Sequence, residues 1–111
     1  MIYEIRTYNL KTGTLDEYWK RFEEKLPGRE HLSKLGGHWY TESGPLNQMV
    51  AIWPYDNLDQ RAQIRREAEA GPNPIWPPNT GELIIEMVSQ IYLPAPFMTP
   101  LGKRKIGPLY E

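Results

Sequence analysis

Residues 38–55 read HWYTESGPLNQMVAIWPY, two short apolar runs separated by a turn. The runs HWYTE (38–42) and NQMVAIWPY (47–55) are rich in aromatic and β-branched residues, which favour β-strands. Gly44 and Pro45 between them are typical of a turn. The segment therefore predicts a β-hairpin, and the rest of the fold can be worked out on either side of it.

A strand and a helix are expected before this hairpin. IYEIRTY (2–8) alternates between two faces, which predicts a strand. The following stretch predicts a helix over 15–26, because its apolar residues recur at helical spacing: Leu15, Tyr18, Trp19, Phe22 and Leu26. Thr14 and Glu17 have the spacing of a capping box. Pro27-Gly28 is expected to interrupt the helix, with one or two further helical turns over 29–35 before Gly36-Gly37.

A second helix, a loop and a fourth strand follow the hairpin. The helix is expected over 56–70, with Asp56 or Asn57 as its cap and a weak apolar stripe formed by Leu58, Ala62 and Ala68. Segment 71–81 contains four prolines and predicts a loop anchored by Ile75 and Trp76. ELIIEMVSQIYL (82–93) predicts a strand. The order βαββαβ indicates an α+β, ferredoxin-like fold: a four-stranded antiparallel sheet with two helices on one face. We expect this domain to occupy residues 1–93, followed by an extended tail over 94–111.

Composition limits the classes of function. The 111 residues suit one domain, and the formal net charge of −1 gives no general attraction to nucleic acid or to an anionic membrane. The absence of cysteine excludes thiolate catalysis and cysteine-ligated metals, and two separated histidines do not suggest a zinc site. We therefore expect no metal and no cofactor. No signal-like or membrane-spanning run is found, so we expect a soluble, cytoplasmic protein.

The sheet is expected to have one face that the helices leave uncovered. On hydrophobicity we place Tyr3, Ile5, Thr7, Val50 and Ile52 toward the helices, together with Leu83, Ile85, Met87 and Ile91. The uncovered face would then hold these residues: Ile2, Glu4, Arg6, Tyr8, Asn47, Met49, Ala51, Trp53, Ile84, Glu86, Val88, Gln90 and Tyr92. Such an apolar patch exceeds what a monomer usually exposes, which predicts a homodimer that packs sheet against sheet. The alternative is that the tail folds back over this face.

The strongest candidate site is a group of three polar side chains that share one face of the first strand: Glu4, Arg6 and Tyr8. A buried arginine needs a partner, which Glu4 or Glu86 can supply. In a functional interpretation, Arg6 binds a substrate carboxylate or enolate and Tyr8 donates a hydrogen bond. In the structural alternative, the group is an internal ion pair that fixes the register of the sheet or the geometry of a dimer.

Other side chains are weaker candidates for contacts in a ligand pocket. His38 is a candidate general base or haem ligand, although a surface or satisfied histidine is the commoner case, and the phase of its strand is ambiguous. Asn47 is a candidate ligand contact or a cap of the sheet edge. Trp53 and Tyr92 are candidate walls of an aromatic pocket or ordinary core residues. A basic cluster on the second helix, Arg61, Arg65 and Arg66, suggests a solvated face.

Three segments together resemble the NIPSNAP family: YEIRTY (3–8), the long run from Leu35 to Arg65, and EMVSQIYLPAPF (86–97). The specific parts are Gly-x-Trp-x-Thr (37–41), GPLNQ, WPY and the Arg61/Arg65 pair. The resemblance implies a dimeric α/β-barrel, related by fold to antibiotic-biosynthesis monooxygenases and haem-binding barrels, but it implies no particular reaction. Two departures stand out. Ala51 occupies a third-strand position where members often carry histidine, and the chain has one domain where eukaryotic members often have two.

These observations lead to one main hypothesis. We expect a homodimeric barrel that binds a small aromatic or carbonyl compound, with cofactor-independent catalysis left open. The alternative is a non-catalytic protein-interaction module whose barrel is only a dimer core. Haem binding through His38 is a third hypothesis.

Overall fold

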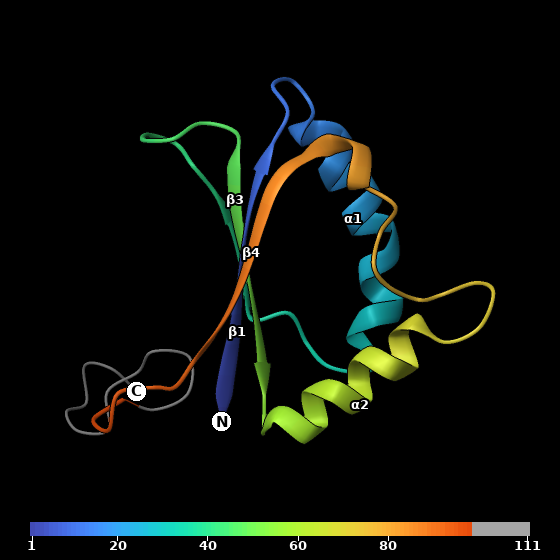
Figure 1. Cartoon of the computed structure of the whole chain (residues 1–111), viewed down its shortest axis with the longest axis vertical. Coiled ribbons are helices and arrows are strands. Elements are labelled where there is room, and N and C mark those ends of the chain that lie inside the picture. Colours follow the sequence, from blue (N-terminus) through green and yellow to red (C-terminus); the bar gives the residue numbers. More distant parts are fainter. Residues whose placement is uncertain (99–111) are drawn as a thin grey trace.

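The computed structural model describes residues 1–98, and its elements run in the predicted order. Strands β1 (Ile2–Leu10), β2 (Gly37–Tyr40), β3 (Gln48–Tyr55) and β4 (Ile84–Tyr92) form one antiparallel sheet in the order β2-β3-β1-β4. Helices α1 (Leu15–Glu30) and α2 (Leu58–Glu69) lie on one face of that sheet (Figure 1). The ferredoxin-like prediction is confirmed. Of the predicted tail, residues 99–111 lie outside the described part of the chain, while Met98 N donates to Ala95 O within a turn.

Helix α1 differs from its prediction at both ends. It continues through Pro27 as a single helix to Glu30, so the predicted interruption is wrong. Arg29 holds the last turn in place, because its buried guanidinium donates to Tyr55 Oη on β3 at 2.8 Å. The predicted capping box is also wrong, since the Thr14 hydroxyl donates to Lys11 O instead of capping the helix.

Helix α2 has the predicted Asn57 cap, whose side chain accepts from Gln60 N at 2.8 Å. Its buried stripe agrees with the predicted one at Ala68 only. Ile64 and Ala68 are buried, whereas Leu58 is 57% exposed. The predicted anchor Trp76 does pack inward from the proline-rich loop, with its ring 5.0 Å from that of Phe22 and 5.7 Å from that of Trp53.

The predicted phase of β1 and β3 is wrong, because the two faces of the sheet are exchanged. Glu4 and Met49 are 1% exposed and lie on the helix side, together with Ile2, Arg6, Tyr8, Ala51 and Trp53. The outer face instead carries Tyr3, Ile5, Thr7, Val50 and Ile52. The assignment by hydrophobicity failed because the burial of the Glu4 carboxylate depends on arginine partners from a distant helix.

Strand β4 follows its predicted phase in part. Met87 pairs with Tyr8 and Ile91 with Glu4 on the helix side, while Val88 pairs with Thr7 on the outer face. A register shift between Asn9 and Leu10 places Ile84 opposite Leu10 and leaves Ile85 67% exposed. The predicted positions of these two isoleucines are therefore wrong.

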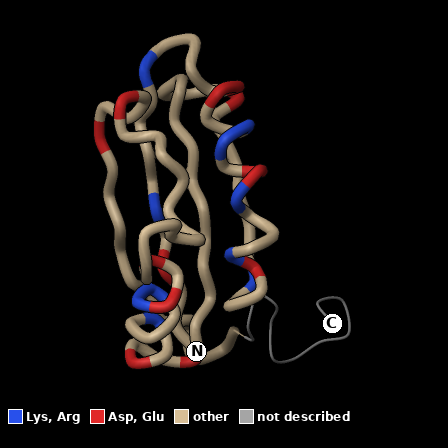
Figure 2. The backbone as a smooth tube through the Cα atoms, turned by 90° about the vertical axis from the view of Figure 1, so that its right-hand side faces the viewer, with Lys and Arg blue, Asp and Glu red and all other residues tan. Residues whose placement is uncertain are grey.

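The outer face of the sheet is apolar and open over the described residues. Trp39 is 55% exposed, and its ring lies against Gly37, where an added Cβ would come within 2.3 Å of the ring. This contact explains the Gly-x-Trp pattern physically, since only glycine leaves room for the indole. Charged residues gather along the two helices, whereas the strands carry few (Figure 2). No helix within residues 1–98 combines the length and apolarity that a membrane span requires.

Candidate functional site

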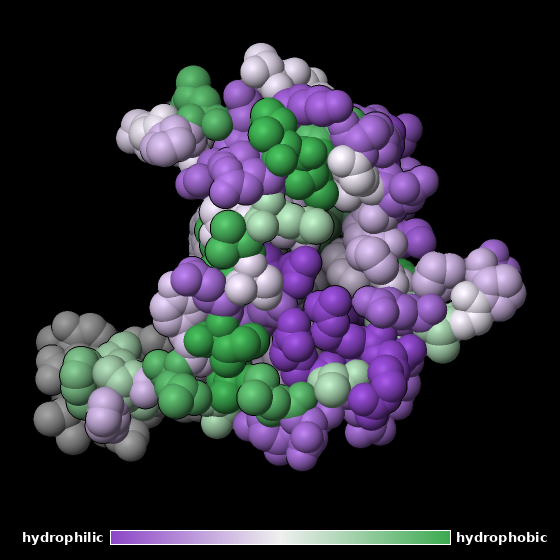
Figure 3. Space-filling model, in the orientation of Figure 1, coloured by the Kyte–Doolittle hydropathy of each residue, from purple (hydrophilic) through white to green (hydrophobic). Residues whose placement is uncertain are grey.

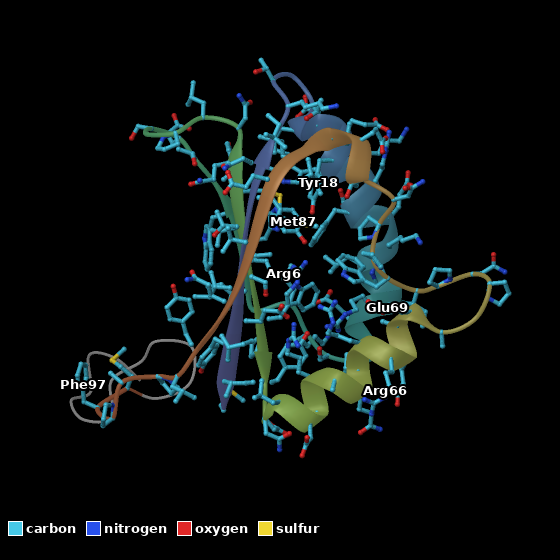
Figure 4. The ribbon with its side chains drawn as sticks, viewed as in Figure 1. Arg6, Tyr18, Arg66, Glu69, Met87 and Phe97 are labelled. Atoms are coloured by element: carbon cyan, nitrogen blue, oxygen red, sulfur yellow. The ribbon has the colours of Figure 1, made fainter. Side chains whose placement is uncertain are left out.

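A cleft lies between the helix side of the sheet and the two helices. It consists of two adjoining cavities of about 80 and 310 Å³ that share Arg6, Tyr8, Trp53, Arg65, Trp76 and Pro77 as walls. We call the two together the helix-side cleft. The surface is hollowed between β4 and the helices (Figure 3), and Arg6 and Tyr18 reach into this space from opposite layers (Figure 4). The smaller cavity is the charged end and the larger one is the apolar end.

Glu4 forms the centre of the charged end. Its Oε2 accepts from Arg6 Nη1 at 2.9 Å, from Arg61 Nη2 at 2.9 Å and from Ser89 Oγ at 2.5 Å. Arg61 Nε also donates to Oε1 at 3.2 Å, which makes the Arg61 contact bidentate. These donors come from three separate elements, so the carboxylate ties β1, α2 and β4 together.

The partners of Glu4 keep it ionised despite its burial. Burial raises the pKa of Glu4, but the hydrogen bonds from Arg61 and Ser89 and the charges of Arg6 and Arg61 outweigh this and lower the pKa to about 2. A carboxylate with so low a pKa and so many donors is a poor proton acceptor at neutral pH. Glu4 therefore acts as a structural anion that positions arginines.

Arg6 and Tyr8 have hydrogen-bonding capacity to spare. Arg6 Nε donates to Tyr8 Oη at 2.9 Å, and Nη1 is used by Glu4. Among the described residues, Arg6 Nη2 has no protein partner, and the Tyr8 hydroxyl, which accepts from Arg6, keeps its own proton free. Both groups line both cavities. Together they can donate to one oxygen atom of a bound molecule.

Arg65 is a third guanidinium at the charged end and is only loosely paired. Its Nη1 lies 4.0 Å from Glu4 Oε2 and its Nη2 lies 3.5 Å from Glu69 Oε1. Neither contact is a hydrogen bond, whereas Arg61, one helical turn earlier, donates two hydrogen bonds to Glu4. Arg29 lies on the other side, with its guanidinium 4.3 Å from the centre of the Trp53 ring. Positive charge thus exceeds negative charge around this cavity.

Aromatic and aliphatic side chains form the apolar end. Tyr18 packs edge-on against Tyr8, with ring centres 6.1 Å apart, and lies 6.0 Å from Phe22. Met49 and Ala51 form the floor on β3. The mouth is on the β4 side, where Met87 lines the cavity and is 60% exposed.

Two hydroxyl groups within the apolar end lack protein partners. Tyr18 is 2% exposed and Thr80 is 5% exposed, and both line the larger cavity. Among the described residues neither side-chain hydroxyl makes a hydrogen bond. Both oxygens are nevertheless accessible, because the one fully enclosed side-chain atom without a partner in residues 1–98 is His38 Nδ1, which lies outside the cleft. Burial raises the pKa of Tyr18, so its hydroxyl remains protonated and can donate. Both hydroxyls therefore face the interior of the cleft.

His38 lies on the helix side of the sheet, opposite Ala51, which settles the ambiguous phase of its strand. Its Nε2 accepts from Trp19 Nε1 at 3.0 Å, and its ring packs 4.8 Å from that of Phe22. Burial lowers the pKa of His38, so the imidazole is neutral at pH 7. It lines neither cavity, and its only free nitrogen is enclosed. The structure therefore supports packing for His38 and gives no access for a ligand.

The other candidates lie away from the cleft. Asn47 adopts a positive φ of 60° in the β2–β3 turn, where its carbonyl accepts from Leu10 N. Glu86 is exposed on the outer face and accepts from Asn9, so it is not the partner of Arg6. Tyr92 is also on the outer face, with its hydroxyl donating to Gln90. Trp53, by contrast, lines both cavities.

Sequence reasoning missed several residues of the cleft. The expectation of a solvated face on α2 is wrong for Arg61, which binds Glu4. It holds for the exposed Arg66 and only in part for Arg65, which pairs with Glu69 but also lines the cleft. The spacing of four residues between Arg61 and Arg65 places both on one side of α2, which was an available signal. Arg29, Tyr18, Thr80 and Ser89 gave no comparable signal, because their roles depend on contacts between distant elements.

The model of the NIPSNAP family matches residues 3–99 of the chain. Among curated proteins, the chain is 37% identical over 75 residues to Protein NipSnap homolog of Dictyostelium discoideum, covering 68% of this chain and 33% of the relative. It is 36% identical over 67 residues to human Protein NipSnap homolog 3A, covering 60% of this chain and 27% of the relative. The chain thus spans about a third or less of these relatives.

Solved structures resemble the chain over most of both lengths. A NIPSNAP family protein of unknown function from Agrobacterium tumefaciens has a TM-score of 0.79 and 39% identity, covering 91% of this chain and 93% of its own. A NIPSNAP domain protein from Burkholderia xenovorans has a TM-score of 0.79 and 30% identity, and the match covers 89% of this chain and 99% of that protein. A candidate antibiotic biosynthesis monooxygenase from Nitrosomonas europaea shares the fold alone. Its TM-score is 0.63 and its identity 11%, and the match covers 85% of this chain and 98% of that protein.

Proposed function

The chain belongs to the NIPSNAP family, and we propose that it binds a small aromatic or carbonyl compound in the helix-side cleft. The observation that carries the proposal is the 310 Å³ cavity, which has aromatic walls and a cluster of donors at one end. This volume is roughly twice the ~150 Å³ of an engineered apolar cavity that binds benzene. A ligand with one or two rings therefore fits the space.

The donors at the charged end suit an oxygen atom of the ligand. Arg6 Nη2 and the Tyr8 proton are both free to donate, and the hydrogen bond between Arg6 Nε and Tyr8 holds the two groups together at 2.9 Å. A carbonyl oxygen placed between them would be polarised, and negative charge developing on it would be stabilised. Arg6 and Tyr8 can in this way stabilise the transition state of a cofactor-independent reaction.

We also propose that two chains associate through their outer sheet faces. Trp39, Val88 and Tyr92 are 55%, 43% and 45% exposed there, flanked by the half-buried outer side chains of β1 and β3. Hydrophobic side chains also extend along β4 and the residues that follow it (Figure 3). An apolar sheet face of this kind is a typical dimer surface. Light scattering at micromolar concentration tests the proposal, and a monomeric mass would contradict it.

Native mass spectrometry of freshly purified protein tests the binding function and reports stoichiometry at the same time. We expect a bound molecule with one or two rings, and calorimetry with neutral 2-naphthamide provides a direct probe if the purified protein is empty. Ala51→Leu should abolish binding because Ala51 forms the floor of the larger cavity.

Ala62→Leu is the matched control, because Ala62 is on α2 and lines neither cavity. It should bind like the wild type. Unchanged binding in Ala51→Leu, or an empty wild-type protein that binds neither 2-naphthamide nor the corresponding acid and amine, would contradict the proposal.

A further inference from the structure

The charged end of the cleft has more positive groups than its own carboxylates can satisfy. Arg6, Arg61 and Arg65 all approach the carboxylate of Glu4, whose Oε2 already accepts from Arg6, Arg61 and Ser89. Arg65 Nη1 lies 4.0 Å from this oxygen, too far for a hydrogen bond. A guanidinium held only by such long contacts at a partly enclosed site favours an anion from outside the protein.

The remaining partner of Arg65 does not satisfy it. Glu69 lies 3.5 Å away without a hydrogen bond, and its side chain is 53% exposed. Such a solvent-exposed pair, one helical turn apart, contributes little to stability. Arg65 is itself 40% exposed and can turn toward the cleft that it lines together with Arg6. The two guanidiniums therefore present free donors to the same space.

The apolar end of the cleft offers a second point of recognition. Tyr18 is almost fully buried, yet its hydroxyl has no hydrogen-bond partner within residues 1–98, and its side chain lines the larger cavity from α1 (Figure 4). Thr80, which lines the same cavity, provides another hydroxyl without a partner among the described residues. Both oxygens are accessible, since neither is among the enclosed unpaired atoms, so each can hydrogen-bond to a polar atom of a ligand in the cavity.

From these two ends we infer that the ligand is an aromatic acid with a hydroxyl or carbonyl oxygen at its far end. This inference rests on the proposed binding function and specifies its chemical class. The carboxylate lies between Arg6 and Arg65, the ring lies among Phe22, Met49 and Trp76, and the distal oxygen meets the hydroxyls of Tyr18 and Thr80.

The charge requirement can be tested with three compounds of nearly equal shape. Calorimetry with 2-naphthoate, 2-naphthamide and 2-naphthylmethylamine compares an anion, a neutral amide and a cation. A charge-assisted hydrogen bond is worth about 1.5–3 kcal/mol, so we expect the acid to bind about 10- to 100-fold more tightly than the amide, and the amine to bind most weakly.

Variants of neighbouring arginines provide the matched control. Arg65→Gln should weaken 2-naphthoate about tenfold or more and leave 2-naphthamide unchanged. Arg66→Gln should change neither affinity, because Arg66 is exposed on the outer side of α2 and lines neither cavity (Figure 4). Equal binding of acid and amide, or equal effects of the two substitutions, would overturn the inference while leaving the binding function standing. Failure of all three compounds to bind would overturn both.

The distal oxygen has its own test. In the wild type, 6-hydroxy-2-naphthoate should bind several-fold more tightly than 2-naphthoate, because its hydroxyl gains a buried partner. Tyr18→Phe preserves the ring and removes the hydroxyl, so this advantage should disappear while the affinity for 2-naphthoate is kept. An advantage that persists in Tyr18→Phe, or that is absent from the wild type, would overturn the assignment of this end of the cleft.

Discussion

Glu4→Gln tests whether a buried carboxylate holds the sheet to α2. The substitution keeps the shape of the side chain but removes the charge that Arg6 and Arg61 bind. The pKa of Glu4 lies at about 2, against an ordinary value of 4.5, which corresponds to about 3 kcal/mol of stability at neutral pH. Because Glu4 is only 1% exposed, this figure needs no reduction for solvent screening.

The dependence on pH follows from the direction of the shift. A carboxylate whose pKa is lowered on folding stabilises the protein above its ordinary pKa, and the stabilisation is lost as the pH falls from about 4.5 toward 2. The free energy of unfolding of the wild-type protein should therefore fall by about 3 kcal/mol over this range because Glu4 becomes protonated. In the Glu4→Gln variant that contribution should be absent at every pH.

Urea unfolding followed by circular dichroism measures both the destabilisation by Glu4→Gln and its dependence on pH. The measurement uses a fixed protein concentration and several pH values between 7 and 3. Glu24→Gln is the control, because Glu24 is exposed on α1 and makes no hydrogen bond to a described residue. We expect about 3 kcal/mol of destabilisation at pH 7 for Glu4→Gln and almost none for Glu24→Gln. A loss below about 1 kcal/mol for Glu4→Gln, or parallel acid slopes in the wild type and this variant, would refute the reasoning.

Three further substitutions test other parts of the structure. Phe22→Ala removes a buried ring that contacts Tyr18, His38 and Trp76, and should cost about 3–5 kcal/mol in urea unfolding; a cost under 1 kcal/mol would show that the ring is not packed as described. His38→Phe leaves the indole N–H of Trp19 without an acceptor and should cost about 1–3 kcal/mol in the same assay; an equally stable variant would contradict that hydrogen bond. Val88→Lys places a charge on the outer face, so light scattering should report a monomer with an unchanged circular dichroism spectrum, whereas an intact dimer would place the interface elsewhere.

The order of the elements could be predicted from the sequence because each element carries its own local signal. Alternation identifies β1, the helical stripe identifies α1, and the prolines of 71–81 mark a loop. The direction in which β1 faces could not be predicted in the same way. Both of its faces carry apolar residues, and the choice is decided by Arg61 and Ser89, which are 57 and 85 positions from Glu4. A local pattern contains no information about contacts at such distances.

The same limit explains why the candidate site was predicted only in part. Glu4, Arg6 and Tyr8 were recognised as a group because one strand presents all three on one face, and the contacts of Arg6 with both neighbours confirm that they interact. The sequence assigns their side of β1 to the uncovered face, which would put a pocket beside them between the two sheets of a dimer, but the cavity is elsewhere. It lies between the sheet and the helices, so its walls come from α1, α2 and the proline-rich loop.

Ala51 shows how one small residue shapes the chemistry of this cleft. It pairs with Arg6 across β1 and β3 and lines the larger cavity. A histidine here, as the resemblance to the family suggests for other members, would place an imidazole beside the guanidinium of Arg6. With alanine, no imidazole lines the cleft among the described residues, and Glu4 is held ionised by its donors. Tyr8 and Tyr18 remain as hydrogen-bond donors, so the side chains of this cleft are better suited to hold and polarise an anionic ligand than to remove a proton from it.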